Sequence, residues 1–315
     1  MSTVLKRFSL AGVAALLAVS VVGCGSGPAK AGSAAIVGGE AIDLKTVQDR
    51  TITVLKKEPD VQQMKEQGKL DQISRLVLSD EILHRIAEYA AQRENITVDQ
   101  NKVYDTVEQA GGAEAASKVS INDPTNIHRA VHDSLVMAEL ARRTLPTLEV
   151  TIDYVQVKDP KEAKEMAEQV AVDPAKMTEF VQAARRNTGG EQQSGTDKKV
   201  RVTEFPSLAA SPLWAAKPGT VVAFQLDPQA STSMVALVKD HRSLSPVPGE
   251  DDIADRVDPK VLYDFGKRVA QYVAADLSME INPRYGVWDP VETQVKPTSG
   301  ERKGFMAPVA TKNKS

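Results

Sequence analysis

The single cysteine, Cys24, is the feature that most limits how this chain can fold. Without a second cysteine no internal disulfide is possible, so the folded chain must be held together by its apolar core. Apolar residues make up 42% of the 315 residues and charged residues 26%, as in an ordinary globular protein. The formal net charge is -3, and aromatic residues are only 4% of the chain. No basic stripe with interleaved aromatic rings is present, and we expect no nucleic-acid partner.

The cysteine closes an apolar leader. Lys6 and Arg7 supply a short basic start, and the apolar run 10–22 follows. A charged start before a short apolar run is the pattern of a secretory signal, whereas a transmembrane helix needs roughly 20 apolar residues. The sequence therefore predicts an exported protein.

The leader ends in Val21, Val22, Gly23 and Cys24, a motif that resembles the lipobox of bacterial lipoproteins. This resemblance implies cleavage before Cys24 and a diacylglycerol on its sulfur. The alternative is a plain secreted protein with a stray cysteine, but Cys24 stands where a lipobox requires it. We expect residues 1–23 to be a signal peptide and the mature protein to be lipid-anchored on the outer face of the cell membrane.

The N-terminal half of the mature chain has the pattern of helices. Residues 24–34 are mostly Gly, Ser, Ala and Pro, which predicts a flexible tether. From there to Pro146 apolar residues recur at helical spacing, with Leu70, Ile73 and Val77 on one face of the longest helix. We expect a helical domain over residues 35–146.

The chain changes character after Pro146. Residues 148–157 alternate and are rich in β-branched side chains, which predicts a strand. Two helices follow, then a stretch at 188–198 that we interpret as a loop, and three more short strands. This order predicts a small α+β domain at 147–242. Beyond it we expect a linker at 243–256, an amphipathic C-terminal helix within 257–289, and a disordered polar tail at 290–315.

Three stretches resemble the SurA/PrsA group of exported chaperones. One is the short strand and Gly-Gly turn at 35–42, and one is the long helix 76–90 with the Ile-Thr-Val entry to the next helix at 94–103. The third is Ile-Asn-Pro-Arg-Tyr-Gly-Val-Trp-Asp at 281–289. The resemblance implies an α+β fold: a mainly helical SurA-type domain, completed by a C-terminal helix, with a small inserted parvulin-like domain.

The middle of the chain departs from the parvulin pattern. Parvulins carry one His in their opening strand and a second in their last strand. Tyr154 and Met234 stand in the corresponding strands here, and the nearest imidazole, His241, is expected past the end of the last strand. Gly189 and Gly190 resemble the Gly-Gly that follows the second parvulin helix. The resemblance implies a degenerate isomerase site at Tyr154 and Met234, in which we assign no catalytic residue.

The sequence gives weaker evidence for other kinds of site. His128 and His132 stand four residues apart on one predicted helix, but no third ligand is close in sequence, so we expect no metal. His84 is expected at the surface or rim of its helix. No Gly-rich phosphate loop is present, and we expect neither a cofactor nor a nucleotide.

The resemblance implies an extracytoplasmic folding factor, a holdase-type chaperone that binds unfolded or newly exported polypeptides through apolar burial. Two alternatives remain. One is an active parvulin-type peptidyl-prolyl cis-trans isomerase, since twisting an amide over a barrier of roughly 18–20 kcal/mol needs no proton transfer to the chain. The other is an envelope adaptor that docks one specific partner.

Overall fold

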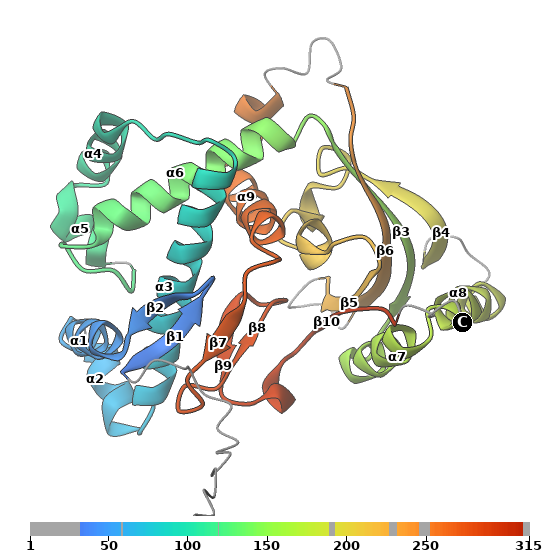
Figure 1. Cartoon of the computed structure of the whole chain (residues 1–315), viewed down its shortest axis with the longest axis horizontal. Coiled ribbons are helices and arrows are strands. Elements are labelled where there is room, and N and C mark those ends of the chain that lie inside the picture. The colour runs from blue at the N-terminus through green and yellow to red at the C-terminus, as the bar shows by residue number, and fades with distance from the viewer. Residues whose placement is uncertain are drawn as a thin grey trace, which may run out of the picture.

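A computed structural model of the chain describes residues 32–57, 59–118, 120–188, 193–226, 232–245 and 253–310. The signal-peptide motif, Cys24 and the Gly189-Gly190 pair lie outside these ranges. The described chain is of the α+β class, with a helical part and a part built on an antiparallel sheet (Figure 1). Within it, no helix combines the length and apolar character that crossing a bilayer requires.

In the described part of the chain six helices precede the main sheet, and the residues that they bury follow the apolar spacing of the sequence. The long helix α3 buries one continuous face because its apolar residues recur every three or four positions. The six are α1 (Leu44–Leu55), α2 (Pro59–Glu66), α3 (Leu70–Arg93), α4 (Gln100–Gln109), α5 (Gly112–Lys118) and α6 (Ile127–Thr144).

The helix α9 (Pro259–Val273) returns from the C-terminal side of the chain and packs against α6 and α3. Asp258 caps its first turn by accepting the N–H of Lys260 at 2.8 Å, and Pro259 is preset for the first helical position. A Cβ at Gly266 would lie 1.8 Å from the carbonyl oxygen of Met137 in α6, so the two helix backbones touch at a point where only glycine fits.

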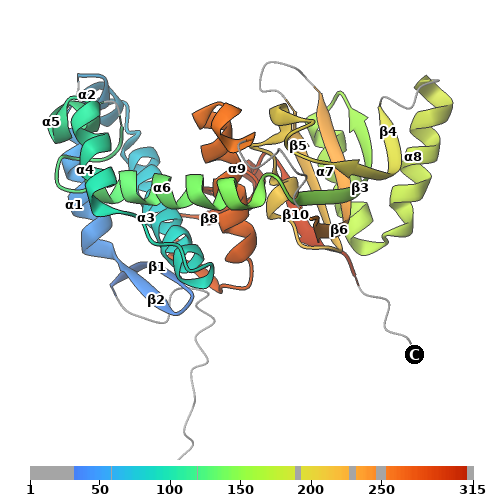
Figure 2. The same cartoon turned by 90° about the horizontal axis from the view of Figure 1, so that it is seen from above.

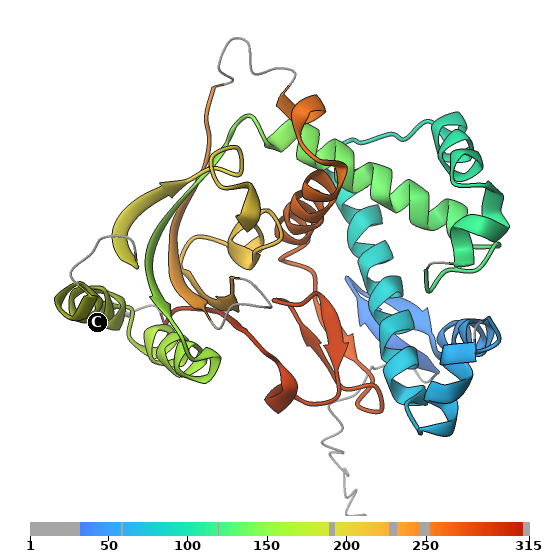
Figure 3. The same ribbon diagram turned by 180° about the vertical axis from the view of Figure 1, so that it is seen from behind.

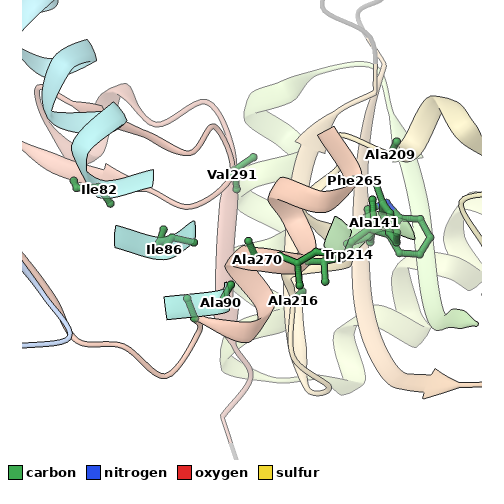
Figure 4. Close-up of a cluster of buried hydrophobic side chains, with 14 of the residues drawn as sticks. Ile82, Ile86, Ala90, Ala141, Ala209, Trp214, Ala216, Phe265, Ala270 and Val291 are labelled. Atoms are coloured by element: carbon green, nitrogen blue, oxygen red, sulfur yellow. The ribbon is translucent and has the colours of Figure 1, made fainter. Parts of the chain in front are cut away.

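The other side of α9 meets the sheet part. Phe265 and Trp214 are fully buried with their rings edge-to-face, the centroids 5.4 Å apart (Figure 4). Trp214 belongs to the 3₁₀ helix η2 (Pro212–Ala215), which follows a first 3₁₀ turn, η1 (Pro206–Leu208). The aromatic pair therefore joins the C-terminal helix to the segment that covers one face of the main sheet.

Arg268 fixes α9 to two further segments of the chain. Its side chain donates to the carbonyl oxygens of Ala210 at 2.8 Å, Pro290 at 3.1 Å and Val291 at 2.7 Å, and to the side chain of Gln271 at 3.1 Å. Burial lowers its pKa to about 10, still far above neutral pH. A buried guanidinium without a carboxylate at bonding distance is held here by carbonyl dipoles.

The main sheet has five antiparallel strands in the order β10-β5-β6-β3-β4. These are β3 (Leu148–Val157), β4 (Ser194–Val200), β5 (Thr220–Gln225), β6 (Ser233–Ser243) and β10 (Phe305–Pro308). The helices α7 (Pro160–Val172) and α8 (Ala175–Thr188) lie on one side of it, and η1 and η2 lie on the other, towards α9 (Figure 3). Seen from above, α6 runs from the helical part straight to the start of β3 (Figure 2).

A smaller sheet, in the order β2-β1-β7, lies against the helices. It combines β1 (Ser33–Val37) and β2 (Glu40–Asp43) with the distant β7 (Met279–Ile281). The predicted tether is wrong at its end, because Ser33 and Ala34 are buried residues of β1. Pairing with β7, far away in the sequence, orders this small-residue stretch.

Two predictions about irregular segments are also wrong. The expected loop at 188–198 contains most of β4, which is ordered by pairing with β3 although its side chains are mainly polar. The expected disordered tail at 290–315 contains β9 (Gln294–Lys296), the 3₁₀ turn η4 (Ser299–Glu301) and β10 (Phe305–Pro308). The strand β9 forms a hairpin with β8 (Val287–Asp289).

The sheet domain is consequently not contiguous in sequence. The strand β10 pairs with β5, and the N–H groups of Val309 and Ala310 bond to the carbonyls of Gly219 and Ala171 at 2.8 and 2.7 Å. Its partners in β5 lie 82 to 88 positions earlier in the sequence, so no local pattern could reveal the strand.

Gly266→Ala should lower the free energy of unfolding by about 2 kcal/mol or more, because the added methyl overlaps the Met137 carbonyl and forces α9 away from α6. Urea unfolding measures the change. Gly300→Ala is the matched control, since the nearest atom to its new Cβ lies 3.7 Å away. Equal stability of the two variants would contradict this account of the helix contact.

Candidate functional site

The main sheet carries a groove on the face opposite α7 and α8, which we call the sheet groove. Along β3, Ile152, Tyr154 and Gln156 point to this face, whereas Val155 lies in the core beneath the two helices. The groove encloses about 420 Å³. Its lining residues come from β3, β4, β6 and the segments that follow β4 and β5: Ile152, Tyr154, Gln156, Lys198, Val200, Phe205, Ser207, Leu208, Leu226 and Met234.

Tyr154 and Met234 both lie in this groove. In the ladder between β3 and β6, Tyr154 pairs with Ala236 and Gln156 with Met234, which makes Tyr154 and Met234 diagonal neighbours on the same face. The structure therefore brings together the two positions that the sequence singled out. They contribute a phenol and a thioether, not two imidazoles.

Gly195 on β4 makes room for the tyrosine ring. A Cβ at this position would lie 2.8 Å from the Cε1 atom of Tyr154. Gly195 faces Tyr154 directly in the ladder between β3 and β4, so the ring lies over bare backbone. This packing directs the phenol into the groove and fixes one of its walls.

The opposite wall is the 3₁₀ segment after β4. The indole N–H of Trp214 donates to the carbonyl of Leu208 at 2.6 Å and holds η1 against the buried core. Phe205 forms the rim, with the ammonium of Lys198 5.3 Å from its ring centroid. The segment from Phe205 to Leu208 thus forms a wall that is apolar inside and cationic at its edge.

The polar groups of the sheet groove are few. Within the part of the chain that the structure describes, its lining includes the phenol of Tyr154, the amide of Gln156, the hydroxyl of Ser207 and the ammonium of Lys198, and no imidazole or carboxylate. An apolar hollow with a few hydrogen-bonding groups is suited to binding apolar side chains.

His241 does not line the groove. Contrary to expectation it lies inside β6, which continues to Ser243, and pairs with Val150. Its ring stacks on Tyr272 of α9 with centroids 4.6 Å apart and planes 4° apart, and its Nε2 lies 3.3 Å from the carbonyl oxygen of Leu213. Burial lowers the pKa of His241. This imidazole is part of the contact between the sheet and α9.

The remaining histidines lie in the helical part. His84, expected at the surface or rim, has a side chain that is 13% exposed and faces Asp133 at 2.8 Å and Glu88 at 3.3 Å. His132 lies 3.5 Å from the same aspartate. His128 packs its ring against Tyr104. Among the described residues, no group of three or more acidic, His or Cys side chains is arranged to hold a metal ion.

Sequence reasoning missed a buried ionic network between three helices. Glu81 of α3 accepts hydrogen bonds from Arg50 of α1 at 2.5 Å and from Arg129 of α6 at 2.8 and 3.1 Å. Burial alone would raise the pKa of Glu81, but the bonds and charges of the two arginines outweigh it and the pKa is lowered. Arg50 stands between Val47 and Val54 on the buried face of α1, which was the available signal.

Of the comparisons with known proteins, only the one with solved structures finds similar chains. No protein-family model matches the chain, and no curated protein matches it. The peptidylprolyl isomerase PrsA of Bacillus anthracis matches at 16% identity and a TM-score of 0.21, over 62% of this chain and 94% of that one. The foldase PrsA of Lactococcus lactis matches at 12% identity and a TM-score of 0.24, over 76% and 88%. PrsA of Bacillus cereus matches at 13% identity and a TM-score of 0.22, over 67% and 84%.

These structures belong to the PrsA group that the sequence motifs resemble. At such identities and TM-scores they say nothing about the activity of this chain. The α+β fold class rests instead on the helices and antiparallel sheets described above.

The protein should become less stable as the pH is lowered, because His241 titrates. Because its folded pKa is lowered, the unfolded chain protonates this imidazole more readily, and the free energy of unfolding decreases as pH falls below about 6.5. His241→Phe keeps a ring on Tyr272 and cannot be protonated. Its stability, measured by urea unfolding at several pH values, should fall less between about pH 7 and pH 5. Parallel curves for the two proteins would contradict the assignment.

Proposed function

We propose that this chain is a folding factor that binds extended, apolar segments of unfolded polypeptides in the sheet groove. The observation that supports this is the groove itself, whose apolar floor and walls come from β3, β6 and η1 and whose polar groups are few. Burial of one large apolar side chain contributes about 1.5–3 kcal/mol, which gives weak, broad and reversible binding. That is the behaviour a holdase requires, since it must release its client.

The same groove supports the isomerase alternative less well. The phenol of Tyr154 and the amide of Gln156 are hydrogen-bond donors that could bond to a twisted prolyl amide. A protease-coupled assay on a proline peptide measures such activity directly. A rate well above the uncatalysed one, lost in the Tyr154→Phe variant, would favour the isomerase over the holdase.

Leu226→Asp tests the sheet groove, because it places a carboxylate in the apolar lining at a half-buried site. The affinity for a labelled apolar peptide should fall roughly tenfold or more, and suppression of client aggregation should weaken in parallel. Val172→Asp is the matched control: this valine is 77% exposed on α7, and the same change there should alter neither measurement.

The holdase proposal fails if an unfolded client aggregates at an unchanged rate over a wide range of protein-to-client ratios. It also fails if Leu226→Asp and Val172→Asp suppress aggregation equally well. In a pull-down, recovery of one or two partners in place of many would favour the adaptor alternative.

We further propose that the protein acts on the outer face of the cell membrane through a lipid on Cys24. Cys24→Ser should move the protein from the membrane fraction to the soluble fraction, because the anchor has no other attachment point. Mass spectrometry of the N-terminal peptide should show a diacylglyceryl group on the wild type alone. An unmodified Cys24 in a membrane-associated protein would contradict the anchor.

A further inference from the structure

The segment Ile281–Asp289, which the sequence singled out and the sheet groove does not use, forms one wall of a second groove. We call it the edge groove. It encloses about 370 Å³ and is lined mainly by apolar side chains from β7, β8 and the turn after β9, including Met279, Ile281, Trp288 and Pro297. Among the described residues that line it, Arg302 alone carries a charge.

The floor of the edge groove is the open side of a sheet. The strand β7 pairs with β1 and with no other described strand. The N–H of Gly38 bonds to the carbonyl of Ser278 at 2.8 Å, and the N–H of Asn282 bonds to the carbonyl of Ala34 at 2.9 Å. Antiparallel ladders alternate, so the backbone groups of Met279 and Ile281 point away from β1, towards the groove.

The shape of the groove is fixed by its glycine. Gly286 has φ +118°, and a Cβ there would lie 2.0 Å from the carbonyl oxygen of Lys296. The turn before β8 therefore lies directly on the strand end of β9. This close approach keeps Trp288 half-buried beside the open edge of β7, where its ring can pack against an added strand.

The guanidinium of Arg302 in the edge groove has no charged partner among the described residues. Arg302 forms no ion pair within the described chain, and its buried Nε atom makes no hydrogen bond. The nearby carboxylate of Glu292 is already paired with Lys296 and with Lys303. A buried donor without an acceptor costs stability, so an incoming carboxylate would be bound favourably.

We propose that the edge groove binds an extended polypeptide segment as a fourth strand on β7, with an apolar side chain against Trp288 and a carboxylate on Arg302. Backbone hydrogen bonds to Met279 and Ile281 would supply sequence-tolerant affinity, and Arg302 would select acidic side chains close to apolar ones. This site deepens the proposed function, on which it rests, by naming the class of client segment.

The test uses a fluorescein-labelled peptide, Val-Thr-Val-Thr-Leu-Glu with an amidated end, and its fluorescence anisotropy with the soluble protein that starts after Cys24. Replacing the peptide Glu by Gln should weaken binding roughly tenfold, and so should Arg302→Gln. In the Arg302→Gln variant the two peptides should bind equally. Arg284→Gln is the matched control, an exposed arginine outside this lining, and should leave the affinity unchanged.

A second peptide, methylated on alternate backbone nitrogens, tests strand addition without any change to the protein. It keeps the side chains but loses donors to the β7 edge, so its binding should be lost. Unchanged binding of this peptide, or an affinity for the parent peptide that Arg302→Gln does not alter, overturns the inference.

The two proposals fail in different ways. If the edge groove is wrong but the folding-factor proposal is right, the peptide fails these tests while aggregation suppression stays sensitive to Leu226→Asp. If the folding-factor proposal is wrong, aggregation is not suppressed at all, whatever the peptide does.

Discussion

The helix α9 packs against α3 and α6 on one side and against η2 on the other, and so fixes the helical part and the sheet part relative to each other. At Gly266 its backbone touches α6, at Phe265 it meets the aromatic ring that anchors the wall of the sheet groove, and at Arg268 it binds three carbonyl oxygens from two other segments. The chain leaves the helical part from α6 into β3 and returns from β6 to α9, and the N–H of Leu244 bonds to the carbonyl of Thr147 at 2.8 Å where the two connections run together. The strand pair β3–β6 thus continues the helix pair α6–α9, and the sheet groove is held in one orientation relative to the helices.

Sequence reasoning succeeded where structure is local. The apolar period of α3, the alternation of β3, and the capped, amphipathic α9 are all patterns within one element, and each predicted its element. It failed where order comes from a distant partner. The polar strand β4 depends on β3, Ser33 and Ala34 depend on β7, and β10 depends on β5. Gly266 could have been noticed, since a glycine inside a helix costs about 1 kcal/mol unless a close approach requires it.

The parvulin resemblance singled out Tyr154 and Met234, and the ladder between β3 and β6 puts them on one face. Nothing in the sequence indicated that Gly195 would lie beneath the tyrosine or that Lys198 would stand over Phe205. His241 illustrates the converse error. By spacing it was the imidazole nearest to a parvulin-like position, yet β6 continues to pair with β3 as far as Ser243 and places His241 on Tyr272 of α9. Burial lowers the pKa of His241. Its ring therefore stabilises the contact between the sheet and α9, and the lining of the sheet groove stays mainly apolar.

The sheet groove and the edge groove have similar features. Each lies against a sheet, is lined mainly by apolar side chains, and has one cation among its described lining residues. Under the proposed function each groove alone would bind weakly, because association costs several kcal/mol of lost freedom that a single buried side chain offsets only in part. A long unfolded chain held at one groove would then stay at a high effective concentration near the other, since α9 fixes the helical part and the sheet part together. Two such weak contacts on a rigid body would hold an extended client while each contact still releases quickly, and a flexible joint at α9 would lose that gain.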